Sequence, residues 1–66
     1  MKLTVNGEQR TFDGIADVAS LVRALGLDPR KVAVERNLEI VPRSAHSLQR
    51  IADGDRFEIV QFVGGG

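Results

Sequence analysis

Residues 17–27, DVASLVRALGL, contain the clearest helical pattern in the chain. An apolar face repeats at the i, i+3, i+4 and i+7 spacing of an α-helix, and it consists of Val18, Leu21, Val22 and Leu25. Asp17 stands where an N-cap accepts from the Ser20 amide, and Gly26 stands where a left-handed C′ residue ends a helix. A helix this short is not stable alone, so the pattern predicts that it covers a sheet.

A β-hairpin is expected before the helix. Leu3 and Val5 alternate with polar neighbours, as in a half-buried strand. The Asn-Gly dipeptide at residues 6–7 suits a tight turn, because both residue types tolerate a positive φ. Residues 9–12 then return as a second strand.

Three more strands are expected after the helix, at residues 32–36, 39–41 and 56–63. An Asn-Leu turn at residues 37–38 connects the first two of them. Pro42 ends the middle one, because proline has no amide hydrogen for a central ladder.

The order of two strands, a helix, two strands, a loop and a last strand indicates an α+β fold with two layers. We expect one domain over residues 1–66, with a mixed sheet of about five strands and the helix on one face. The predicted core comprises Leu3, Val5, Phe12, Val18, Leu21, Val22, Leu25, Val32, Val34, Ile40, Leu48, Ile51, Phe57 and Ile59.

Residues 43–49 read as an irregular loop, and we expect Leu48 and Ile51 to be tucked under the sheet. The single histidine, His46, lies in a polar part of this loop. No acid or nucleophile is placed beside it by spacing, so we expect an exposed side chain without a catalytic role.

Composition excludes several classes of function. Lys plus Arg and Asp plus Glu number 9 each, and the zero net charge argues against nucleic acid or an anionic membrane as partner. The chain has no cysteine and one histidine, so no metal site is expected. No apolar run approaches the roughly 20 residues of a membrane span, and the first residues lack a signal-peptide pattern. A cytoplasmic protein without catalytic residues of its own is therefore expected, because 66 residues enclose no deep pocket.

The last strand carries apolar residues on both faces. Phe57 and Ile59 point one way, and Val60 and Phe62 point the other way. If the first pair covers the helix, the second pair is exposed. Such a face is either a partner surface or an ordinary scatter of exposed apolar residues.

The chain closes with Gly64, Gly65 and Gly66. Glycine packs nothing and loses the most entropy on ordering, so residues 63–66 are expected to form a flexible tail. A frayed end or a cloning remnant would read the same way. A sharper interpretation is chemical: a carboxylate on residues without side chains can enter another protein's active site. ATP there could convert it to an acyl-adenylate for attack by sulfur or nitrogen.

The chain resembles the small sulfur carriers of bacterial thiamine biosynthesis, the ThiS family, which have a ubiquitin-like β-grasp fold. The resemblance runs in family order over essentially the whole chain. Its matching stretches are residues 3–7, 25–27, 32–37, 40–43, 53–55 and 62–66.

The resemblance implies that a partner activating enzyme uses ATP to adenylate the carboxylate of Gly66. The adenylate becomes a thiocarboxylate, with sulfur from cysteine through a desulfurase, and a thiazole synthase takes that sulfur. The carrier is then a co-substrate that binds no cofactor. Val60, Phe62 and Val63 are the expected partner-binding residues, and Gly64 and Gly65 form the tail.

Some alternatives stay open. Family members need a terminal Gly-Gly, so Gly65 would be the working end if the third glycine were a remnant. The small subunit of molybdopterin synthase has a similar tail but is typically longer. A protein modifier attached to lysines would need a ligation system. A β-grasp interaction module with an inert tail would keep its function without Gly65 and Gly66.

Overall fold

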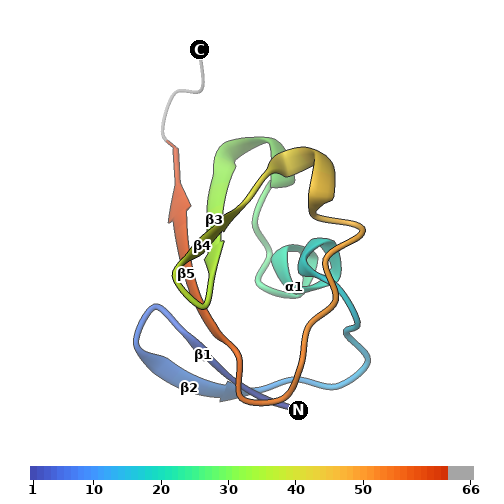
Figure 1. Cartoon of the computed structure of the whole chain (residues 1–66), viewed down its shortest axis with the longest axis vertical. Coiled ribbons are helices and arrows are strands. Elements are labelled where there is room, and N and C mark those ends of the chain that lie inside the picture. The colour runs from blue at the N-terminus through green and yellow to red at the C-terminus, as the bar shows by residue number, and fades with distance from the viewer. Residues whose placement is uncertain (63–66) are drawn as a thin grey trace.

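The structure is a computed structural model that describes residues 1–62, which form a sheet with an α-helix on one face (Figure 1). The elements in chain order are β1 (Lys2–Val5), β2 (Glu8–Thr11), α1 (Val18–Ala24), β3 (Val32–Arg36), β4 (Glu39–Val41) and β5 (Arg56–Gln61), with short 3₁₀ turns at Pro29–Lys31 and Arg43–Ala45.

The five strands form one mixed sheet in the order β2-β1-β5-β3-β4. The last strand in sequence therefore lies in the centre of the sheet. β5 runs parallel to β1 and antiparallel to β3, and each outer strand pairs antiparallel with its hairpin partner. This arrangement confirms the predicted α+β class and the β-grasp fold.

Both ends of α1 are closed as the sequence predicts. The Asp17 carboxylate accepts a hydrogen bond from the Ser20 amide at 2.8 Å, and the Ser20 hydroxyl accepts one from the Asp17 amide at 3.1 Å. At the other end Gly26 has a φ of 74°, and the Leu27 amide donates to the Val22 carbonyl at 3.1 Å. This is a Schellman ending, which satisfies carbonyl groups that the helix leaves open.

The helix lies between the sheet and the returning segment 42–55 (Figure 1). Val18, Leu21 and Val22 have no exposed surface, and burying each contributes about 1.5–3 kcal/mol. The Val18 amide donates to the Gln49 carbonyl at 3.0 Å, which ties the segment to the start of the helix.

Most of the predicted core is buried as expected. Phe12 and Leu25 are partly buried and pack against the core. The fully confirmed residues are Leu3, Val5, Val18, Leu21, Val22, Val32, Val34, Ile51, Phe57 and Ile59.

The prediction for β4 was wrong by one residue. Ile40 is 77% exposed, whereas Val41 is buried. Ile40 pairs with Glu35 and Val41 pairs with Val34, so the buried face of β3 dictates which residue of β4 faces inward. A three-residue strand with two adjacent apolar residues has no alternation from which this phase could be read.

Two predictions for the loop were also wrong. Leu48 is 76% exposed, and His46 is 4% exposed. The His46 Nε2 atom lies 3.1 Å from the Val41 carbonyl, and it must be the donor because a carbonyl oxygen accepts. This bond holds the ring inside the protein in the middle of the loop, while Leu48 is left outside. The Nδ1 atom is buried without a hydrogen-bond partner among the described residues.

The last strand was predicted over residues 56–63, and β5 ends at Gln61. The predicted flexible tail, residues 63–66, lies outside the described residues. Within residues 1–62, no helix is long and apolar enough to cross a membrane.

Candidate functional site

The central strand β5 separates a buried face from an exposed one. Phe57 and Ile59 are buried against the helix side, and Val60 and Phe62 are 60% and 47% exposed. The predicted separation of the two pairs is therefore confirmed. Val60 lies near the end of β5 and Phe62 follows the strand, so the exposed pair directly precedes the glycine tail in the sequence.

Neighbouring strands extend the exposed face. Ala33 pairs with Val60, so small and apolar side chains are grouped near the end of β5. One step back, Glu35 pairs with Glu58, and Ile40 pairs with Glu35 on the edge strand. The exposed face thus has an apolar part near the end of β5 and an acidic part beside it.

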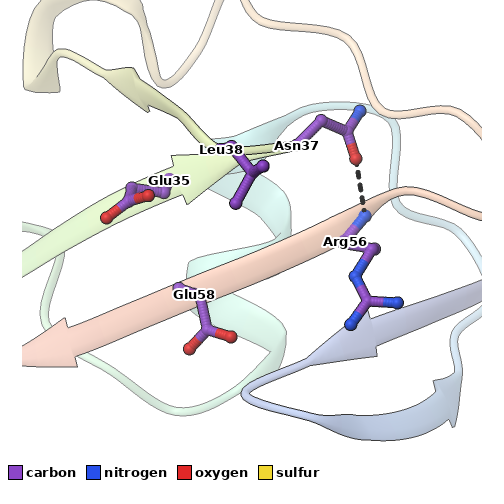
Figure 2. A pocket seen from close by; sticks show the side chains of 5 residues that line it. All are labelled: Glu35, Asn37, Leu38, Arg56 and Glu58. Carbon is purple, nitrogen blue, oxygen red and sulfur yellow. Dashed lines mark hydrogen bonds between the residues drawn. The ribbon is translucent and has the colours of Figure 1, made fainter.

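A hollow of about 330 Å³ lies beside these acidic residues (Figure 2). Its lining contains two carboxylates and one guanidinium, without a nucleophile or an imidazole. This lining offers no nucleophile–base pair for covalent catalysis. The lining residues are Glu35, Asn37, Leu38, Arg56 and Glu58.

A buried carboxylate, Asp55, organises the start of β5. It accepts hydrogen bonds from Arg36 Nε at 2.7 Å, from the Ala52 amide at 2.9 Å and from Asn37 Nδ2 at 3.1 Å. Burial by itself raises the pKa of this carboxyl. The hydrogen bonds from Ala52, Asn37 and Arg36 outweigh burial and hold the pKa below its usual value.

The other end of β5 is held on both edges. On the β1 side, the Asn6 side chain donates from Nδ2 to the Ile59 carbonyl at 3.1 Å and accepts from the Ile59 amide at 2.7 Å. On the β3 side, the Phe62 amide donates to the Lys31 carbonyl at 2.7 Å. The strand is therefore anchored up to the last residue that the structure describes.

Sequence reasoning missed the roles of Asn6 and Asp55. Asn6 was assigned to a turn, which is correct, but the long-range bonds of both residues have no local signal. Asn6 and Ile59 are 53 positions apart in the sequence, and Asp55 and Arg36 are 19 apart.

The residues to which the chemistry was assigned, Gly64, Gly65 and Gly66, lie outside the described residues, as does Val63. Within residues 1–62 no group of three or more His, Cys, Asp or Glu residues could hold a metal ion. The described site is thus a surface and an anchored strand that leads to the tail.

Comparison with known proteins gives one consistent result. The sequence model of the ThiS family matches residues 3–66. A protein named thiazole synthase from Paramagnetospirillum magneticum is 56% identical over 66 residues, which are all of this chain and 20% of that protein. The sulfur carrier protein ThiS of Bacillus subtilis is 39% identical over 49 residues, 74% of each chain. The crystal structure of the thiamine biosynthesis protein ThiS from Geobacter metallireducens matches all of both chains with a TM-score of 0.84 at 40% identity.

Proposed function

Because the chain belongs to the ThiS family, we propose that it carries sulfur for the thiazole step of thiamine biosynthesis. The observation that carries this proposal is the family match, which extends through the glycine tail to residue 66. The structure supports it with a central strand that leads towards that tail and has an accessible apolar face at its end.

The reaction that we propose takes place at the Gly66 carboxylate. A carboxylate oxygen attacks the α-phosphate of ATP on an activating enzyme, and pyrophosphate leaves. Oxide is a poor leaving group, whereas AMP is a good one, so sulfide can displace AMP from the adenylate; sulfur that arrives as a persulfide is first reduced to this level by a thiol. The product is a thiocarboxylate whose soft, nucleophilic sulfur stays tethered to the carrier. The chain is a co-substrate in this scheme, and ATP is bound by its partner.

We propose thiazole synthase as the acceptor of the sulfur. The chain spans 20% of the length of the curated Paramagnetospirillum relative, which is named thiazole synthase and matches the whole of this chain. Such a relative holds a matching segment and the rest of a thiazole synthase in one polypeptide. Sulfur supply from cysteine through a desulfurase and a cytoplasmic location complete the proposal.

Val60, Phe62 and Val63 are the residues that we propose to contact the activating enzyme and the synthase. Val60 and Phe62 are large apolar side chains that the fold leaves exposed, immediately before the reactive tail. Burying apolar area at a partner surface contributes about 25 cal/mol per Å² removed from water. Docking at this place would direct the tail into the partner's active site.

The test of the carrier chemistry is the intact mass of the chain after incubation with its host's activating enzyme, ATP and a sulfide source. We expect a mass gain equal to the exchange of one oxygen for sulfur, located at the terminal glycine. An unchanged mass, with the enzyme active on another carrier, would contradict the proposal and favour an interaction module with an inert tail.

The docking surface has its own test in the substitutions Val60→Ser and Phe62→Ser. Both side chains are exposed, so each change should alter the unfolding free energy by no more than about 0.5 kcal/mol. We expect the conversion by the activating enzyme to fall at least tenfold, roughly the loss of one buried apolar side chain. The matched control is Leu48→Ser. Leu48 is also an exposed apolar residue, at 76%, but it lies in the segment 42–55 and not on the proposed docking face. Equal conversion by all three variants would refute the assignment of this face.

A further inference from the structure

We propose that Asn6 is a positioning residue for the sulfur-transfer reaction, because its side chain holds the exit end of β5 from which the tail continues. This inference rests on the proposed carrier function. It assigns to Asn6 a role beyond that of a turn residue, and it concerns how the tail is presented rather than how it reacts.

The pairing between β1 and β5 is short. It covers two positions, Thr4 with Arg56 and Val5 with Phe57. At residues 6–7 the chain then turns away into the hairpin, with φ angles of 50° and 82°. From Ile59 onwards, this edge of β5 would face no backbone of β1.

The Asn6 side chain occupies that position and acts as one more residue of strand. Its carboxamide accepts from the Ile59 amide at 2.7 Å and donates to the Ile59 carbonyl at 3.1 Å, and both bonds are partly buried. A strand neighbour would supply the same donor and acceptor. Glycine would accept the left-handed turn but has no side chain, and aspartate would accept a hydrogen bond but not donate one at neutral pH.

The place of this bond along β5 gives it a functional consequence. Ile59 lies four positions before Val63, the first residue of the proposed tail. If this end of the strand loosens, additional backbone must be ordered each time the tail enters a partner. Ordering the backbone of one more residue weakens the binding equilibrium between carrier and partner about five- to thirtyfold. The pairing of β5 with β3 remains, so we expect the loss of about one residue's order.

Asn37 offers a matched control within the same chain. It also has a φ of 50° and also occupies the first position of a two-residue hairpin turn. Its Oδ1 atom accepts from the Arg56 amide at 2.9 Å, at the start of β5 rather than at its exit. Asn6→Gly and Asn37→Gly therefore make the same chemical change at the two ends of one strand.

The experiment measures ATP–pyrophosphate exchange by the host's activating enzyme with the 66-residue chain and these two variants, well below their unfolding temperatures. We expect Asn6→Gly to raise the KM for the carrier about five- to thirtyfold with kcat within twofold of the unchanged protein. Asn37→Gly should leave both constants within twofold, even though it destabilises the fold. A purely structural role of Asn6 would leave the KM of the folded variant unchanged, or would raise it equally in both variants, and either result overturns the proposal.

Hydrogen exchange at the Ile59 amide keeps this test independent of the carrier chemistry. Protection of this amide should fall at least tenfold in Asn6→Gly and persist in Asn37→Gly. If the Ile59 amide stays protected in Asn6→Gly, the side chain does not hold the strand and the inference is wrong, whatever the enzyme does. If the unchanged chain supports no ATP–pyrophosphate exchange by the activating enzyme, the carrier function fails, and the positioning role that rests on it fails too. If the unchanged chain supports this reaction but the two variants have equal KM values, only the positioning role is refuted.

Discussion

The two hairpins have turns of the same length and a similar backbone, but a different residue at the second turn position. Each turn begins with an asparagine at a φ of 50°, Asn6 in one and Asn37 in the other. The second position is Gly7 at 82° in the first turn and Leu38 at 71° in the second. Glycine adopts this region without strain, whereas a side chain there costs about 1–2 kcal/mol.

The cost of the left-handed backbone at Leu38 is compensated by hydrogen bonds from distant parts of the chain. The Asn37 side chain donates to Asp55 and accepts from the Arg56 amide, and His46 donates to the Val41 carbonyl on the edge strand of the same hairpin. The first hairpin has a fully exposed outer strand. The Asn6-Gly7 pair thus favours its turn locally, whereas the second turn contains the strained Leu38 and is held by these tertiary hydrogen bonds.

The strongest way to break this contrast is Asp55→Ala. The change leaves the Arg36 guanidinium, the Ala52 amide and the Asn37 side chain without their acceptor. We expect the free energy of unfolding in urea to fall by about 2–4 kcal/mol. The control is Asp53→Ala in the same turn, an exposed residue that accepts one bond from the Lys2 amide and should cost about 1 kcal/mol or less. Equal losses in the two variants would contradict the central role of Asp55.

His46→Ala tests the anchor on the edge strand. The substitution removes a buried ring and its hydrogen bond to the Val41 carbonyl, so we expect a loss of about 2–3 kcal/mol in unfolding free energy. Leu48→Ala, a change at an exposed position of the same loop, should stay within about 0.5 kcal/mol. A larger effect at Leu48 than at His46 would reverse the burial that the structure assigns to them.

Reciprocal substitutions compare the two second positions directly. Gly7→Ala should destabilise the protein by about 1 kcal/mol through the backbone alone, because an added Cβ meets no atom within 4 Å. Leu38→Gly relieves backbone strain at a residue that is 90% exposed. Because glycine has more entropy in the unfolded chain, part of this gain is lost, and we expect a net stabilisation of about 0.5–1 kcal/mol. Thermal unfolding of both variants would measure the pair, and changes of the same sign would disprove the strain at Leu38.

Acid provides the mildest perturbation of the second hairpin. The folded pKa of Asp55 lies below its unfolded value, so its contribution to stability is present above about pH 4 and decreases as the pH falls through the folded pKa. Asp17 and Asp28 also have lowered pKa values, that of Asp28 about 2, and they titrate in any variant of Asp55. We therefore compare the two proteins between pH 5 and pH 2, the range in which these carboxylates titrate. The unfolding free energy should decrease less in Asp55→Asn than in the unchanged chain. Parallel pH profiles would show that Asp55 makes no such contribution.

The local features of this protein were determined by the sequence itself. The caps at Asp17 and Gly26, the apolar face of α1, both hairpin turns and the opposite faces of β5 were all predicted correctly. Apart from the Asn37-Leu38 turn, each depends on residues within a few positions of one another, where hydrogen-bond geometry and side-chain periodicity have few alternatives. The family motifs added the fold topology and the chemistry proposed for the tail.

Tertiary structure alone decided which residue of β4 faces inward, which side chain of the loop is buried and what holds β5. Ile40 and Val41 are adjacent and equally apolar, so the register with β3 made the choice. His46 is buried because the Val41 carbonyl offers its ring an acceptor. The bonds from Asn6 to Ile59 and from Asp55 to Arg36 join residues far apart in sequence, whose types do not reveal their partners. Such contacts exist once the sheet has assembled, because only the assembled sheet brings their donors and acceptors within hydrogen-bonding distance.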